Sequence, residues 1–91
     1  MTYNDSALTA QMAPVPRRSA KAGNAVVVKP TMGAEDFSCF ANTMPGLLVG
    51  LGVSKEGAEP GERASNHSPC FCVNDDALPY GVKVLSNLSM T

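Results

Sequence analysis

The apolar and polar positions of the first 30 residues predict a helix followed by a strand. Apolar residues recur at helical spacing within 5–21, namely Leu8, Met12 and Val15. The helix is expected to open at Asp5 or Ser6. It is expected to end or kink near Ala13, because the two prolines that follow lack an amide hydrogen. The run AVVVKP at 25–30 is short, β-branched and closed by proline, which predicts a strand.

The middle of the chain predicts a second helix and a buried strand. In TMGAEDFSCFANTMPG (31–46), one helical face carries the apolar residues Phe37, Phe40, Ala41 and Met44. Gly33 is expected at a strand-to-helix turn. Glu35 and Asp36 then fall in the first helical turn, where the helix dipole favours negative charge. The run LLVGLGV at 47–53 is apolar without alternation, which is typical of a strand covered on both faces.

The last third of the chain predicts a long loop, a short strand and a closing helix. Residues 54–69 contain several glycine and proline breaks, and loops of this length in compact domains are usually functional or disordered. CFCVN at 70–74 predicts a strand, and 75–90 a helix capped by Asp75 or Asp76. The apolar stripe expected on this helix is Leu78, Val82, Leu85 and Leu88 or Ser89.

These elements together predict an α/β fold. Their order, α-β-α-β-loop-β-α, indicates a partial three-layer α/β/α sandwich. Three short strands make a thin sheet, and a strand as apolar as 47–53 needs neighbours on both sides. We therefore expect the 91 residues to be part of a larger domain.

Composition and charge argue against several classes of partner. The formal net charge is −1 and the basic residues are scattered, so no nucleic-acid partner is expected. No apolar run approaches the roughly 20 residues that span a bilayer, so no membrane partner is expected. The first ten residues lack the pattern of a secretory signal, and three cysteines do not form a disulfide framework. These features favour a reducing, cytoplasmic location.

Candidate chemistry concentrates in RASNHSPCFC, which contains His67, the one histidine of the chain. A histidine on a polar loop before a strand is placed where ligands and catalytic groups occur, although such side chains are more often simply solvated. A zinc site of three cysteines and His67 has the correct ligand count but poor spacing, because Cys39 lies far upstream. A cysteine nucleophile with His67 as its base lacks a recognisable third group. The favoured interpretation makes Cys70 and Cys72 small buried hydrophobic residues.

A second candidate is the carboxylate pair Glu35–Asp36, which could serve acid/base chemistry. Favourable charge at a helix N-terminus explains the same pair more simply.

Several stretches taken together resemble one family. MGAEDFSCFANTMPG, LGV and SNHSPCFCVNDDALPYGVKVL are similar, in this order, to the C-terminal end of the metal-dependent amidohydrolases. This family includes hippurate hydrolase, N-acyl-amino-acid amidohydrolases and the plant indole-3-acetyl amino acid hydrolases. The resemblance covers roughly residues 4–88. Each motif is weak alone, and the ordered set is specific.

The resemblance implies a fold and a chemistry. Family members have an α/β catalytic domain with two divalent metals and a smaller dimerisation domain. Residues 1–91 would be the C-terminal part of the catalytic domain, with its N-terminal half and the dimerisation domain outside this sequence. The substrate class would be small N-acyl amino acids or peptides, the metal zinc, manganese, nickel or cobalt, and the full-length assembly a dimer.

The resemblance also assigns roles to individual residues. It implies that His67 is a metal ligand and that the Gly33–Ala34–Glu35 turn borders the active site. Asn66 and Ser68 would orient His67. The other metal ligands and the general base would lie upstream, so no catalytic residue is expected within this chain and activity of the chain alone is not expected. A non-catalytic interaction module is the alternative, because 47–53 would expose apolar surface in isolation.

Overall fold

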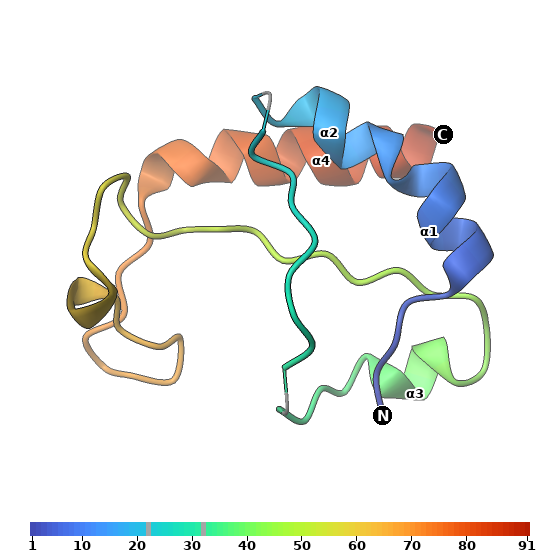
Figure 1. Ribbon diagram of the computed structural model, residues 1–91, viewed down its shortest axis with the longest axis horizontal. Coiled ribbons are helices and arrows are strands. Elements are labelled where there is room, and N and C mark those ends of the chain that lie inside the picture. Colours follow the sequence, from blue (N-terminus) through green and yellow to red (C-terminus); the bar gives the residue numbers. More distant parts are fainter. Residues whose placement is uncertain (22, 32) are drawn as a thin grey trace.

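The computed structural model describes residues 1–21, 23–31 and 33–91. The described elements are α1 (Ser6–Met12), α2 (Pro14–Ser19), α3 (Ser38–Ala41), the 3₁₀ turns η1 (Pro60–Glu62) and η2 (Asp75–Ala77), and α4 (Leu78–Met90). Figure 1 shows α1 and α2 in succession beside the long α4, while extended segments and loops make up the rest of the molecule. None of the described helices is long and apolar enough to cross a membrane.

The N-terminal helix forms and breaks as the sequence predicts. Asp5 caps α1, because its carboxylate accepts a 2.8 Å hydrogen bond from the Leu8 amide. The chain kinks at Ala13, which ends α1 and caps α2. Pro14 opens α2, where its missing amide hydrogen would have had no helical partner in any case. The expected kink near Ala13 is therefore confirmed.

The small core of the chain lies between α2 and α4, which pack against each other. Val15 is 1% exposed and Ser19 is 2% exposed. The Asn87 side-chain amide donates a 3.1 Å hydrogen bond to the Ser19 hydroxyl, so this buried polar group has a partner from α4. In the sequence Ser19 stands where an apolar helix residue would be expected, but in the structure it joins the two helices.

The apolar stripe predicted for α4 is wrong as the packing face at its first three positions, whereas Leu88 is half-buried as predicted. Leu78, Val82 and Leu85 are 51%, 68% and 68% exposed. The half-buried residues of α4 are Tyr80, Gly81, Val84, Asn87 and Leu88. The predicted cap is also wrong: Asn74 caps the 3₁₀ turn η2, where its side-chain oxygen accepts a 3.2 Å hydrogen bond from the Asp76 amide, and α4 itself begins after Ala77 without a side-chain cap. α4 thus has apolar residues on more than one side, and only part of them is covered.

The three predicted strands do not form in the part of the chain that the structure describes. Segments 25–30, 47–53 and 70–74 carry no strand assignment. A strand needs a ladder of backbone partners, and 47–53 receives a single backbone–backbone bond, from the Asn74 amide to the Val53 carbonyl at 2.8 Å. The α/β/α sandwich remains a prediction about the larger domain, whose sheet these segments could not build alone.

The helix predicted within 31–46, after the Gly33 turn, is also wrong in extent. Only α3, a single turn, forms; residue 32, which precedes the Gly33 turn, lies outside the described residues. The Glu35 carboxylate accepts a 3.2 Å bond from the amide of Phe37, and the Thr43 hydroxyl donates to carbonyls of α3. Such local side-chain bonds compete with a continuing helix at both ends.

Candidate functional site

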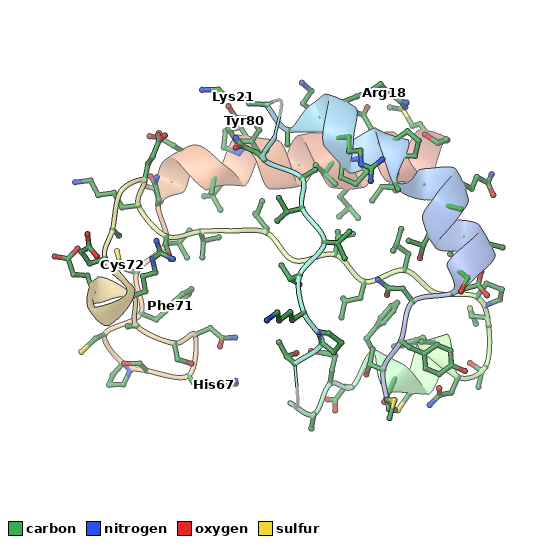
Figure 2. All side chains as sticks on the ribbon, viewed as in Figure 1. Arg18, Lys21, His67, Phe71, Cys72 and Tyr80 are labelled. Atoms are coloured by element: carbon green, nitrogen blue, oxygen red, sulfur yellow. The ribbon has the colours of Figure 1, made fainter. Side chains whose placement is uncertain are left out.

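His67 lies in a tight turn at the tip of the loop between η1 and η2. Its amide donates to the Ser65 hydroxyl at 3.2 Å, and the Ser68 amide donates to the Ser65 carbonyl at 2.8 Å. The side chain is exposed, and its imidazole makes no hydrogen bond to any described residue. In Figure 2 the labelled ring points away from the loop, at the end remote from α4. Both ring nitrogens are therefore open to a ligand from outside this chain.

Asn66 and Ser68 form bonds within the same turn. The Ser68 hydroxyl accepts from the Cys70 amide at 3.1 Å, and the Asn66 side-chain oxygen lies 3.5 Å from the Ser65 hydroxyl. These bonds shape the backbone on either side of His67. The role predicted for Asn66 and Ser68, orienting the His67 ring, stays a prediction.

The Gly33–Ala34–Glu35 turn is an exposed segment before α3. The space where a Gly33 side chain would begin is open, with no heavy atom within 4 Å. Glu35 is fixed on both sides, since its carboxylate caps the Phe37 amide and its carbonyl accepts from the Thr2 hydroxyl at 3.3 Å. No described hydrogen bond or hollow joins this turn to His67, so its place at an active site stays a prediction.

The cysteines are not buried. Cys39, Cys70 and Cys72 are all free and exposed, which corrects the prediction that Cys70 and Cys72 pack as small buried hydrophobic residues. Among the described residues the segment 70–74 joins no sheet, so no neighbouring strand buries these side chains. Cys70 and Cys72 line an open hollow of about 650 Å³, together with Arg63 and residues of 54–58; His67 is not among its lining residues.

The described residues do not form a metal site by themselves. No three His, Cys, Asp or Glu side chains among them lie where they could share a metal ion. A catalytic zinc needs three protein ligands, and this loop offers one imidazole. The residues present therefore do not fit a catalytic metal without further ligands.

Sequence reasoning missed Asn4, which fixes the extended segment after α3. Its side-chain amide donates to the Leu48 carbonyl at 3.0 Å, and its side-chain oxygen accepts from the Leu48 amide at 2.8 Å. The neighbouring Asp5 amide donates to the Gly46 carbonyl at 2.9 Å. The sequence offers no signal for these contacts, because the partners lie more than 40 positions apart.

Comparison with known proteins places the chain in one family. The model of the peptidase family M20/M25/M40 matches residues 1–91. The protein is 42% identical over 65 residues to IAA-amino acid hydrolase ILR1-like 2 of Arabidopsis thaliana, covering 71% of this chain and 14% of that protein. It is 35% identical over 88 residues to ILR1-like 4 of the same plant, covering 97% of this chain and 20% of the relative.

A relative from another organism also matches part of the chain. Thermostable carboxypeptidase 2 of Saccharolobus solfataricus is 43% identical over 56 residues, covering 62% of this chain and 14% of that protein. No solved structure matches the chain. The chain spans 14% to 20% of the length of these curated relatives. With the family model matched along all 91 residues, the resemblance seen in the sequence is confirmed: the chain belongs to the peptidase family M20/M25/M40.

Proposed function

We propose that this chain is part of a metal-dependent hydrolase that cleaves the amide bond of N-acyl amino acids, and that it supplies His67 to the metal site. The family match over residues 1–91, with relatives named IAA-amino acid hydrolases, carries the proposal. The exposed His67 ring, without a hydrogen-bond partner among the described residues, supports the role of ligand. A neutral imidazole suits zinc, manganese, nickel and cobalt alike.

Activity in this proposal belongs to a complete catalytic domain. The chain matches only 14% to 20% of the length of its relatives, and its described residues gather no metal-binding set. The chain alone is therefore expected to be inactive, and the remaining ligands and the general base would come from the rest of the domain. The Gly33–Glu35 turn would border the substrate, the complete enzyme would be a dimer, and its setting would be the cytoplasm.

A chimera tests the proposal. The C-terminal segment of Arabidopsis ILR1-like 4 that matches this chain is replaced by the 88 matching residues. Release of the free amino acid from an indole-3-acetyl amino acid and the metal content of the purified protein are then measured. We expect activity in the chimera. In its His67→Ala variant we expect at least about 10-fold to 100-fold lower activity and less bound metal, because loss of a residue that only orients a metal ligand already costs about that much.

The matched control is Asn24→Ala, another exposed polar side chain outside the His67 loop. It should leave activity and metal content unchanged. Full activity and full metal content in the His67→Ala chimera would contradict the assignment of His67 as a ligand.

A further inference from the structure

Ser65 forms both hydrogen bonds that close the turn around His67. Its hydroxyl accepts from the His67 amide at 3.2 Å, and its carbonyl accepts from the Ser68 amide at 2.8 Å. A serine hydroxyl that bonds the amide two residues later is a recurrent way of fixing a turn. Among the described residues, Ser65 is the one hydrogen-bond partner of His67.

The same pattern repeats at Ser68, directly after His67. The Ser68 hydroxyl accepts from the Cys70 amide at 3.1 Å, and its carbonyl accepts from the Phe71 amide at 3.1 Å. Pro69 stands at the second position of this turn, where its fixed φ angle is favourable. His67 is therefore the last central residue of one serine turn and the neighbour of the next, so bonds on both sides restrict its backbone.

The chain is also held on either side of these two turns. The Nε and Nη2 atoms of Arg63 donate to the Ala58 carbonyl at 3.0 Å and 2.6 Å, which fixes the chain just before the first turn. The Asn74 amide donates to the Val53 carbonyl at 2.8 Å, which fixes the chain after the second turn. The turns thus connect two held segments.

The side chain of His67 has no comparable support. It is exposed, and its ring makes no hydrogen bond to any described residue. The position of the ring therefore depends on the backbone of the turn, because the few rotamers of a side chain are set relative to its own backbone. Asn66 and Ser68, which were expected to orient His67, make no described hydrogen bond to it. Ser65 does so directly.

We infer that Ser65 is the positioning residue of His67. It fixes the turn that carries the imidazole, so the ring is held in place before the rest of the metal site forms. Such preorganisation strengthens binding, because the loop does not have to be ordered when the ligand binds. Residues that support a metal ligand typically contribute about 10-fold to 100-fold to metal affinity. Ser65 acts through the backbone and not through the ring, which favours the lower end. The inference rests on the proposed function.

The experiment uses the chimera in which these residues replace the matching segment of Arabidopsis ILR1-like 4. Its Kd for zinc is measured by competition with a chelating dye. Ser65→Ala keeps the carbonyl and loses the hydroxyl, so we expect the Kd to rise about tenfold. Ser65→Thr keeps a hydroxyl and should restore the affinity. Ser54→Ala is the matched control, because it removes an exposed serine hydroxyl outside the two turns, and it should leave the Kd unchanged.

A second measurement separates positioning from folding. Ser65 is exposed, and an exposed substitution away from the core changes stability little. The thermal midpoint of the metal-free chimera should therefore be the same with serine or alanine at position 65. A lower midpoint in the Ser65→Ala chimera would make the role of Ser65 structural and would overturn the inference.

Two further results would overturn it. One is a wild-type Kd in the Ser65→Ala chimera while His67→Ala raises the Kd, which rejects the positioning role and leaves the proposed function standing. The other is a Ser65→Thr chimera as weak as Ser65→Ala, since the hydroxyl would then not matter. A wild-type Kd in the His67→Ala chimera would instead reject His67 as the ligand, so failure of the inference and failure of the proposed function give different results.

Discussion

Replacing Val15 by alanine should remove much of the stability of the isolated chain. Val15 is the one apolar side chain among the described residues that is fully buried, at 1% exposure. The substitution deletes two methyl groups, worth about 1.6 kcal/mol of transfer free energy. The cavity that remains between α2 and α4 adds to this loss, so we expect the free energy of unfolding to fall by about 2 kcal/mol.

The loss is large against the stability available. A 91-residue domain of ordinary composition has a free energy of unfolding of roughly 5 to 14 kcal/mol. A chain with so small a core should lie at or below the lower end of this range. With a urea dependence of about 1 kcal/mol per M, the midpoint of unfolding should fall by about 2 M. Circular dichroism of the helices during a urea titration measures this midpoint directly.

Val27→Ala is the matched control, since it makes the same change at a side chain that is 93% exposed. Its midpoint should move by no more than about 0.5 M. Equal shifts for Val15→Ala and Val27→Ala would refute the reasoning, because the α2–α4 contact would then not be the core. A wild-type chain without a cooperative transition would refute it as well.

Three further predictions concern the helices and the metal. Asn74→Ala removes the side-chain cap before α4 and should lower the free energy of unfolding by about 1 kcal/mol in the same titration. Asp75→Ala should change the free energy of unfolding by less than about 0.5 kcal/mol. A larger loss for Asp75→Ala than for Asn74→Ala would identify Asp75 as the cap. Ser19→Ala and Asn87→Ala, alone and together, should show a coupling of about 1 kcal/mol in a double-mutant cycle, and additive effects would exclude the hydrogen bond. Zinc and EDTA should leave the midpoint of the isolated chain unchanged, because its described residues gather no ligand set; unfolding by EDTA would indicate a structural zinc site.

Local signals in the sequence predicted the helices at the two ends of the chain well. Asp5 and the prolines after Ala13 act on the backbone next to them, so the start of α1 and the kink followed from residue type alone. The closing helix was predicted for the same reason, although the side-chain cap is that of Asn74 on the preceding turn η2. The contact of Asn4 with Leu48 could not be predicted, because it depends on how distant segments pack.

The site was predicted through family resemblance rather than through local pattern. Composition gave no reason to prefer His67 over a solvated loop histidine, whereas the ordered motifs on either side of it identified the family that the comparisons confirm. The structure adds that the ring is exposed and without a described hydrogen-bond partner. It could not test the ligand role, because the other ligands implied by the resemblance lie outside this chain.

Several of the predictions that failed share one physical cause. The segment 47–53 was predicted to be buried, 25–30 to be a strand and the stripe of α4 to be its packing face, and each carries exposed apolar side chains here: Val49 is 44% exposed, Val27 93% and Val82 68%. Apolar surface of this extent on a small chain marks an interaction site. The apolar pattern of a segment reflects how that segment packs in the complete domain. The chain spans at most 20% of the length of these relatives. The pattern and the structure therefore agree if the buried state of these residues requires the rest of the catalytic domain.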